Sequence, residues 1–211
     1  MKHAPTFEYE HLYWQQDIAQ IAGIDEAGMG ALAGPVVAAA VILPPDFSVP
    51  GVRDSKTLSV RQRELLVVAI QQQALAWAVG QASVAEITTL NIRRAAHLAM
   101  QRAVDQLLPQ PLLLLVDGNP CQPHPTIPAS TLVKGDICST SIAAASIVAK
   151  VHRDQIMVKL DQEWPQYGFA QHKGYGSQAH LAALATHGAC SHHRPTYAPV
   201  AHLLTPASEV S

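Results

Sequence analysis

Apolar runs alternate with amphipathic stretches along the chain, and both kinds of segment stop at glycine, proline or a helix-capping residue. The run at 36–43 contains no charged residue, which is typical of a strand buried on both faces. A shorter apolar run precedes it, across a glycine-rich connection. The whole pattern predicts strands at 21–25, 36–43, 77–83, 112–116 and 131–134.

Amphipathic or alanine-rich segments between these runs predict helices. Ser59 followed by Gln62 has the spacing of a capping box, so one helix is expected over 60–73. The other helices are expected at 91–108, 139–160 and 177–186. Strands followed by alternating strand and helix predict an α/β domain around a mixed sheet, with a helical appendage at the C-terminus.

The length allows one well-filled domain and a small appendage, but not two large domains. The chain has 211 residues, of which 48% are hydrophobic and 14% are charged. Residues 1–19 lack a clear apolar period, so they are expected to form a loosely packed lead-in. The main domain is then expected over 20–160, and a C-terminal helical extension over 161–211.

Charge and cysteine content narrow the class of protein. The net charge is -2 and the pI is about 6.6, so any nucleic-acid surface must be local. Three widely spaced cysteines without a CxxC pair, and no N-terminal signal sequence, favour a cytoplasmic protein. No apolar run reaches the roughly eighteen residues of a membrane span. The Cys190, His192 and His193 cluster lacks the paired four-ligand spacing of a structural zinc site.

Carboxylates follow three of the predicted strands. Asp25 and Glu26 close the first strand, Asp117 closes the most apolar one, and Asp136 follows a short strand and Gly135. An aspartate that caps a turn before glycine is a common reason for such a residue. In open α/β sheets, however, ligands lie at strand ends near a change in strand order. If these strand ends converge, the four carboxylates share one site.

Such a cluster needs protons or cations. Two like charges about 4 Å apart repel by roughly 4 kcal/mol at an effective dielectric constant of about 20. Oxygen ligands without organised cysteine or histidine partners favour Mg²⁺ or Mn²⁺ over zinc. Neighbours on a regular strand point to opposite faces, so Asp25 and Glu26 can reach one centre only if the strand bulges or ends there.

The glycines that follow these acids, in GIDEAGMGALAGP at 23–35, have two interpretations. They can form a turn after the strand, because glycine tolerates positive φ. Alternatively, bare backbone lets a bulky anionic ligand approach peptide N–H groups. The glycines at 28 and 30 also make an irregular strand end reasonable.

Six motifs in order resemble the bacterial ribonuclease HII family. They are GIDEAGMGALAGPVVAAAV (23–41), DSKTLS (54–59), VDG (116–118), KGD (134–136), SIAAASIVAKVHRD (141–154) and YGFAQHKGYG (167–176). One DE or DG pair is weakly specific, but six motifs in sequence, within a match from about residue 21 to 200, are very specific. The resemblance implies an α/β fold with a ribonuclease H-like mixed β-sheet flanked by helices and a small helical C-terminal appendage.

The resemblance also implies an activity. Family members hydrolyse the RNA strand of RNA/DNA hybrids and incise 5′ of single ribonucleotides in duplex DNA. Asp25, Glu26, Asp117 and Asp136 would be the catalytic and metal-binding acids, with Mn²⁺ or Mg²⁺ as cofactor. Two-metal-ion hydrolysis leaves 5′-phosphate and 3′-hydroxyl ends. The expected partners are hybrids and ribonucleotide-containing duplexes, and the chain is expected to be a cytoplasmic monomer without a membrane partner.

The remaining motif residues are assigned to substrate binding by the same resemblance. In the family, a Gly-Arg-Gly turn reads the ribose 2′-hydroxyl through its backbone, and here it is Gly28-Met29-Gly30. Met29 cannot donate to a phosphate as arginine does. Tyr175 matches a tyrosine that stacks on the sugar beside the junction. The other expected substrate contacts are Ser55, Lys56, Ser146, Lys150, Arg153 and Lys173.

Three of these contacts fall on one helical stripe, since Ser146, Lys150 and Arg153 are four and three residues apart. A solvated face is the ordinary interpretation of such a stripe, and here it is expected to lie along the duplex. Asp154 is interpreted as an ion-pairing residue rather than a ligand. His172 is compatible with either proton transfer or a structural role.

Two alternatives compete with the nuclease. A catalytically weakened hybrid-binding protein is motivated by Met29 alone, and metal-dependent nicking separates it from an enzyme. A nucleotide-binding α/β protein lacks support, because no GxxxxGK[ST] or GxGxxG turn follows a predicted strand.

Overall fold

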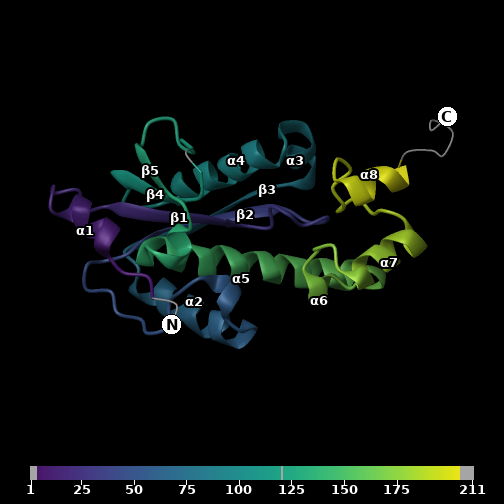
Figure 1. The fold of residues 1–211 in the computed structure, drawn as a ribbon, viewed down its shortest axis with the longest axis horizontal. Coiled ribbons are helices and arrows are strands. Elements are labelled where there is room, and N and C mark those ends of the chain that lie inside the picture. The colour runs from purple at the N-terminus through teal and green to yellow at the C-terminus, as the bar shows by residue number, and fades with distance from the viewer. Residues whose placement is uncertain (1–3, 120, 205–211) are drawn as a thin grey trace.

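A five-stranded mixed sheet forms the centre of the computed structural model, which describes residues 4–119 and 121–204 (Figure 1). Its strands are β1 (Ile21–Ala27), β2 (Val36–Ile42), β3 (Ala76–Ala82), β4 (Leu113–Asp117) and β5 (Ala129–Leu132). They lie in the order β3-β2-β1-β4-β5. β1 and β3 are antiparallel to β2, whereas β4 is parallel to both β1 and β5. The predicted α/β class is confirmed.

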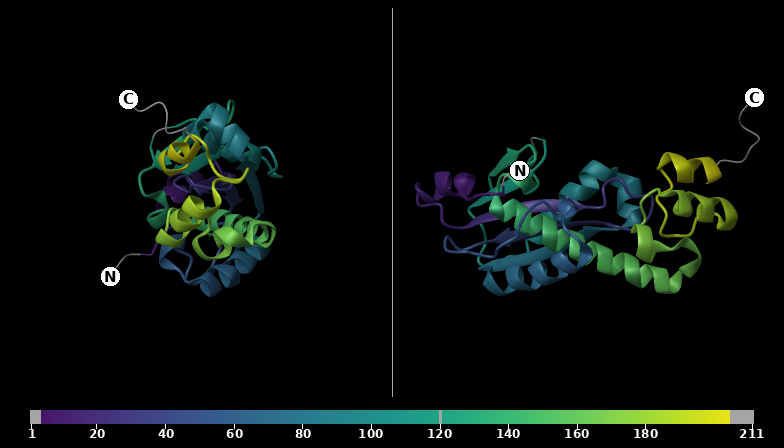
Figure 2. Two further views of the ribbon diagram at one scale, coloured as in Figure 1. Left: turned by 90° about the vertical axis from the view of Figure 1, so that its right-hand side faces the viewer. Right: turned by 60° about the horizontal axis from the view of Figure 1, so that its bottom comes forward.

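Helices cover both faces of the sheet. They are α1 (Glu8–Trp14), α2 (Val60–Gln73), α3 (Val84–Leu90), α4 (Ile92–Val104), α5 (Thr140–Glu163), α6 (Phe169–His172), α7 (Gln178–His187) and α8 (Ala198–Leu204). α4 packs on one face beside α3, and α5 packs on the other with α2 against it (Figure 1). α6, α7 and α8 extend the molecule beyond one end of the sheet (Figure 2). No helix in the described part of the chain is long and apolar enough to cross a membrane.

Capping residues explain where the helices begin. Ser59 and Gln62 form both hydrogen bonds of the predicted capping box at the start of α2. Ser83 and Glu86 form a second capping box, which starts α3, a helix that the hydrophobic pattern did not reveal. Asn91 then accepts the first backbone N–H groups of α4 with its side chain. Ser83 therefore begins a helix that was not predicted, and Asn91 begins the helix that was predicted over 91–108.

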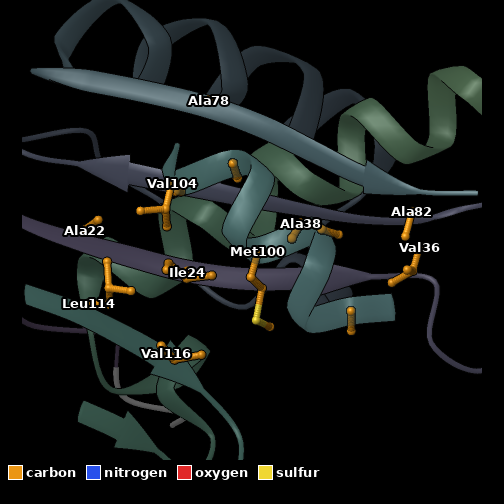
Figure 3. Packing of buried hydrophobic residues seen from close by; sticks show 14 of the residues in the cluster. Ala22, Ile24, Val36, Ala38, Ala78, Ala82, Met100, Val104, Leu114 and Val116 are labelled. Atoms are coloured by element: carbon orange, nitrogen blue, oxygen red, sulfur yellow. The ribbon is translucent and has the colours of Figure 1, made fainter. Parts of the chain in front are cut away.

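The core follows from the alternation of side chains along β1 and β4. Ile24 and Val116 point to the α4 face, where Met100 and Val104 pack against them (Figure 3). The opposite face of β1 meets the N-terminal turn of α5. Gly23 permits this approach, because a Cβ there would lie 2.1 Å from the Ser141 carbonyl carbon. A larger residue at position 23 would push α5 away from the sheet.

The N-terminal segment differs from the loosely packed lead-in expected over 1–19. Residues 8–14 form α1, which brings the buried Glu10 carboxylate to the start of α5. Its Oε1 accepts hydrogen bonds from Ser139 Oγ at 2.7 Å and from the Ser141 backbone N–H at 2.9 Å. A carboxylate is favoured beside the positive end of a helix dipole. The N-terminal segment thus anchors the start of α5.

The C-terminal elements are joined to the sheet through the loop that follows β1. The Leu32 N–H donates to Gly174 O at 2.8 Å, and the Gly34 N–H donates to His192 O at 2.9 Å. α5 runs to Glu163, through the boundary predicted at residue 160. That division between domains stays a prediction. The contacts hold the C-terminal segment against the glycine-rich loop of the sequence motif.

Candidate active site

Three carboxylates from three segments meet at one edge of the sheet. The parallel register pairs Ile24 with Val116, so Asp25 and Asp117 lie one residue further along neighbouring strands. β5 leads into a 3-10 turn (Gly135–Ile137), which carries Asp136. Carboxylate oxygens of the three aspartates lie within 4.8 Å of one another. The expected convergence of strand ends is therefore observed for three of the four acids.

The turn that carries Asp136 is anchored by Asp117. Asp117 Oδ1 accepts the Gly135 N–H at 2.7 Å. Lys134 has a left-handed backbone with φ 60°, which reverses the chain after β5. A Cβ at Gly135 would lie 2.6 Å from Ile142 Cδ1, so only glycine fits there without displacing that side chain. Local backbone constraints thus hold Asp136 beside Asp117.

Glu26 occupies the other face of β1. The pairing of Asp25 with Ala39 and of Glu26 with Ala38 is regular, so the bulge considered from the sequence is absent from this strand. Asp25 therefore points to the α5 face and Glu26 to the α4 face. The strand ends one residue later, at Ala27, and the Glu26 carboxylate lines a cleft together with Asp117. Glu26 is adjacent to the three-aspartate cluster but is not one of its members.

Burial and mutual repulsion disfavour the ionised forms of these acids. Burial raises the pKa of Asp25 well above its usual value, and the charges of Glu26 and Asp117 raise it further. Burial and the Asp117 charge raise the pKa of Glu26 to about 7. Burial and the charge of Asp136 raise the pKa of Asp117, although the Gly135 hydrogen bond opposes this. The negative charges of the ionised carboxylates are therefore not fully balanced by the protein, and a bound cation can balance them.

Two serines that were expected to contact substrate lie behind Asp25 instead. Ser55 and Ser146 are both only 3% exposed, and their Oγ atoms are 2.8 Å apart. A hydrogen bond from Ser146 opposes the rise in the pKa of Asp25. Their burial corrects the expectation of direct phosphate contact, because they support the carboxylate from the protein side.

Lys56 is a cation beside the acidic cluster. Its side chain is 74% exposed, and Nζ lies 3.4 Å from Asp136 Oδ2. Burial would lower the pKa of Lys56, but the charges of Asp25 and Asp136 outweigh it and raise the pKa. The ammonium group therefore lies at the surface beside the acidic cluster, and its contact with substrate stays a prediction.

The predicted stripe on α5 faces the protein rather than solvent at two of its three positions. Arg153 is fully buried, and its guanidinium donates to the backbone carbonyls of Ala33, Pro35 and Lys173 at 3.0 to 3.1 Å. The expectation that Arg153 lies along a duplex is therefore wrong. Arginine serves here because its planar group can donate in several directions at once. It ties α5 to the loop after β1 and to the C-terminal segment.

Lys150 and Asp154, both half-buried, form an ion pair on the same helix. Lys150 Nζ lies 2.7 Å from Asp154 Oδ1, and Arg63 Nη2 lies 3.6 Å from Asp154 Oδ2. Asp154 is thus an ion-pairing residue, as the sequence predicted. Lys150 also lies 5.7 Å from the ring centroid of Tyr175, close enough for a cation–π contact.

Tyr175 presents its ring at the surface of the C-terminal segment. The residue is 38% exposed, and the Arg153 guanidinium carbon lies 5.3 Å from the ring centroid. Lys173 precedes it with a left-handed backbone, and its ammonium group donates to the Ala170 carbonyl. Both nitrogens of His172 contact backbone groups, Nε2 at Tyr167 O and Nδ1 at the Gly174 N–H. These contacts favour the structural role of His172.

The Gly28-Met29-Gly30 turn packs against protein groups at its first two residues and has open space beside Gly30. Gly28 has φ +99°, and a Cβ there would lie 2.0 Å from Arg153 Nε. A Cβ at Gly30 would meet no heavy atom of the described structure within 4 Å. The Met29 carbonyl accepts from Tyr197 OH at 2.6 Å and from Arg194 Nη1 at 2.9 Å. The positive φ of Gly28 confirms the turn interpretation, and the open space at Gly30 leaves room for a ligand, whose approach stays a prediction.

Arg194 and Tyr197 hold the turn at Met29, and the sequence analysis did not predict this role. Arg194 is fully buried, and it also donates to Gly34 O through Nε and Nη2. Bonds between a side chain and distant backbone carbonyls leave no spacing pattern in the sequence. One available signal was a lone arginine in a segment without other Asp, Glu, Lys or Arg residues.

The donor set fits a divalent cation. Among the described residues, Asp25, Asp117 and Asp136 are the group of acidic, histidine or cysteine side chains that converge closely enough to hold one. All of their ligand atoms are carboxylate oxygens, which suit Mg²⁺ or Mn²⁺. Burial and neighbouring acids raise the pKa of Asp25 and Asp117, so a bound cation would stabilise their ionised forms.

Comparison with known proteins agrees with this geometry. Residues 22–200 match the family model for Ribonuclease HII. Ribonuclease HII of Albidiferax ferrireducens is 53% identical over 208 residues, covering 98% of this chain and 99% of that protein. The structure is similar to ribonuclease H2 from Pyrococcus horikoshii, with a TM-score of 0.74 and 24% identity, covering 87% of this chain and 96% of that one.

A further structural neighbour is the Bst-RNase HIII complex with Mn²⁺. Its TM-score is 0.71 at 20% identity, and the match covers 89% of this chain and 70% of that chain. At this identity the likeness establishes the fold alone. The sequence matches, in contrast, cover nearly the whole chain. The chain belongs to the ribonuclease HII family and is a divalent-metal-dependent ribonuclease.

Proposed function

We propose that this ribonuclease hydrolyses the RNA strand of RNA/DNA hybrids and incises 5′ of single ribonucleotides in duplex DNA. The observation that carries the proposal is the convergence of Asp25, Asp117 and Asp136 beside a glycine turn with open space at its second glycine. Acids that hold a cation can act on a phosphodiester, and exposed backbone can read a sugar at close range.

Asp25, Asp117 and Asp136 hold the divalent cations, with Glu26 contributing from the adjoining face of β1. Bound Mg²⁺ or Mn²⁺ supplies Lewis-acid chemistry, which activates water and stabilises charge on a leaving oxygen. Burial and the charges of neighbouring acids raise the pKa of Asp25 and Asp117, so a bound cation favours their ionised forms. The expected products carry 5′-phosphate and 3′-hydroxyl ends.

The chain's own residues orient the substrate. The backbone of Gly28 and Gly30 approaches the ribose and distinguishes its 2′-hydroxyl from the hydrogen of deoxyribose. The exposed ring of Tyr175 stacks on the neighbouring sugar. Lys56, Lys150 and Lys173 provide positive charge toward the phosphates.

The segment 161–211 completes this binding surface. Its contribution is supported by the contacts of Gly174 with the loop after β1 and by the position of Tyr175 above Arg153. Contact with Arg153 holds the aromatic ring near the Gly28 turn, so that sugar stacking and ribose sensing act on neighbouring groups. The monomeric state and the cytoplasmic location stay predictions.

A catalytically weakened hybrid-binding protein is the second candidate, because Met29 stands where the family pattern has arginine. Cleavage of a DNA duplex with one ribonucleotide, with and without Mn²⁺, tests both. The proposal expects a metal-dependent nick on the 5′ side of the ribonucleotide and no cut in the matched all-DNA duplex. A gel shift without cleavage in the presence of Mn²⁺ would contradict the enzyme and support the binder.

A further inference from the structure

We propose that Arg93, in the first turn of α4, binds a backbone phosphate of the nucleic acid beside the catalytic carboxylates. It thereby supplies the cation that Met29 does not. The inference rests on the proposed function, since it requires a nucleic-acid substrate. Arg93 would be a substrate-binding residue from a part of the chain outside the six sequence motifs.

A cleft on the α4 side of the sheet provides the setting. Its volume is about 320 Å³, and it lies between the end of β1, the turn after it, α4 and the end of β4. The lining residues that matter here are Glu26, Met29, Arg93, His97, Met100 and Asp117. Because Asp117 also belongs to the three-aspartate cluster, the cleft adjoins the candidate metal site.

Arg93 contributes the positive charge among the residues that line the cleft. Among the described residues that line the cleft, it is the single lysine or arginine. It is exposed, and within the described chain its guanidinium has no hydrogen-bond or ion-pair partner. Arg102 on the same helix, in contrast, forms an ion pair with Glu86 at 2.7 Å. The free guanidinium of Arg93 can bind a phosphate through two parallel hydrogen bonds.

The position of Arg93 in α4 also favours an anionic ligand. A cation in the first turn of a helix interacts unfavourably with the helix dipole, so it does not stabilise α4. The cap does not need it either, because Asn91 Oδ1 accepts the backbone N–H groups of Arg93 and Arg94. A phosphate at this end of the helix would interact favourably with both the guanidinium and the dipole.

Met29 faces the same cleft from the turn after β1. Its side chain packs against the core cluster that includes Met100, and its carbonyl is held by Arg194 and Tyr197. A methionine side chain offers no hydrogen-bond donor to a phosphate. Since positions 29 and 93 line one cleft, a cation at either position can serve the same phosphate. His97 adds no second cation at neutral pH, because burial and the Arg93 charge lower its pKa.

Four variants test the assignment: Arg93→Ala, Arg94→Ala, Met29→Arg and the double variant Met29→Arg/Arg93→Ala. Arg94 is the matched control, since it is also exposed in the first turn of α4 but does not line the cleft. Binding of a duplex with one ribonucleotide is measured without divalent metal by fluorescence anisotropy, over a series of salt concentrations. Incision in Mn²⁺ is measured in parallel, and thermal unfolding verifies that each variant is folded.

Arg93→Ala is expected to weaken binding about 10-fold and to reduce the salt dependence by about one phosphate contact. Arg94→Ala should stay within about twofold of the unsubstituted protein. In the double variant, the new arginine at position 29 should recover most of the loss, and it should gain less when Arg93 is present. That non-additivity is the signature of one shared phosphate.

An unchanged salt slope in Arg93→Ala, an equal loss in Arg94→Ala, or no recovery in the double variant would overturn the assignment. The proposed function fails separately, if the unsubstituted protein binds the duplex but does not incise it in Mn²⁺. The binding measurement by fluorescence anisotropy still tests the role of Arg93 in that case, because binding requires no cleavage.

Discussion

Buried charge is handled in opposite ways at the edge of the sheet and at the junction of α5 with the C-terminal segment. Arg153 and Arg194 are fully buried, and their guanidinium groups donate to several backbone carbonyls. Asp25 is also buried, but the groups nearest to it include other acids, and its pKa is raised. The difference indicates that protein groups satisfy the buried arginines, whereas a bound cation from outside the chain would stabilise the ionised forms of the buried acids.

Removing one acid is expected to produce the largest effect on function with the least on folding. Asp117→Asn should reduce cleavage by about 1000-fold or more, because a cation ligand is lost. The free energy of unfolding should be unchanged or higher, because a repulsive charge is removed. Cleavage rates in Mg²⁺ and Mn²⁺, with urea unfolding curves, measure both quantities. Substantial residual turnover would refute the ligand role of Asp117.

Removing a buried arginine should reverse this pattern. Arg153→Met leaves the carbonyls of Ala33, Pro35 and Lys173 without their donor, which we expect to cost about 3 kcal/mol of unfolding free energy. Arg153→Lys should recover only part of it, because one ammonium group cannot donate in the same three directions. Urea unfolding of both variants measures the loss. Full stability of Arg153→Met would show that these bonds do not hold the C-terminal segment.

Acid should weaken the C-terminal segment through its buried histidines. Burial lowers the pKa of His193 to about 4, and His180 is shifted in the same direction. The unfolded chain therefore binds protons that the folded chain does not, and stability falls as the pH drops below about 6.5. His193 alone should contribute a loss of about 2 kcal/mol between pH 7 and pH 5.

Urea unfolding at pH 7 and pH 5 measures this effect. His193→Gln removes the titrating group, so the part of the pH dependence that His193 contributes should disappear. His187→Gln is the control, because His187 is exposed at the end of α7. If His187→Gln and His193→Gln change the pH dependence equally, the buried histidine is not its source.

The smallest expected effect concerns substrate choice. Tyr175→Ala should reduce incision at a single ribonucleotide by about 10-fold, while cleavage of long RNA stretches changes less, because stacking is worth about 1–3 kcal/mol. The ratio of the two rates under one set of conditions is the measurement. Equal losses on both substrates would count against stacking by Tyr175.

The sequence predicted the sheet, the larger helices and the residues of the acidic centre for identifiable reasons. Apolar runs and capping boxes are local, so they marked β2 and the start of α2 correctly. The acids were found because each follows an apolar run. α3 was missed because its seven residues carry too short a pattern, although Ser83 and Glu86 marked its start.

The arrangement of side chains around the site was harder to predict. Helical spacing grouped Ser146, Lys150 and Arg153 on one stripe, but spacing does not tell whether the stripe faces solvent or protein. Arg153 is buried because its partners are carbonyls of a loop more than a hundred residues away. Glu26 points away from Asp25 because the strand stays regular, which the neighbouring glycines did not indicate.

The central claim is that Asp25, Asp117 and Asp136 form one pocket for a divalent cation. The most direct measurement is the anomalous difference density of a crystal soaked in Mn²⁺. We predict a peak enclosed by oxygens of the three aspartates, and its loss in crystals of Asp117→Asn. Separated carboxylates without such a peak at a saturating Mn²⁺ concentration would contradict the account.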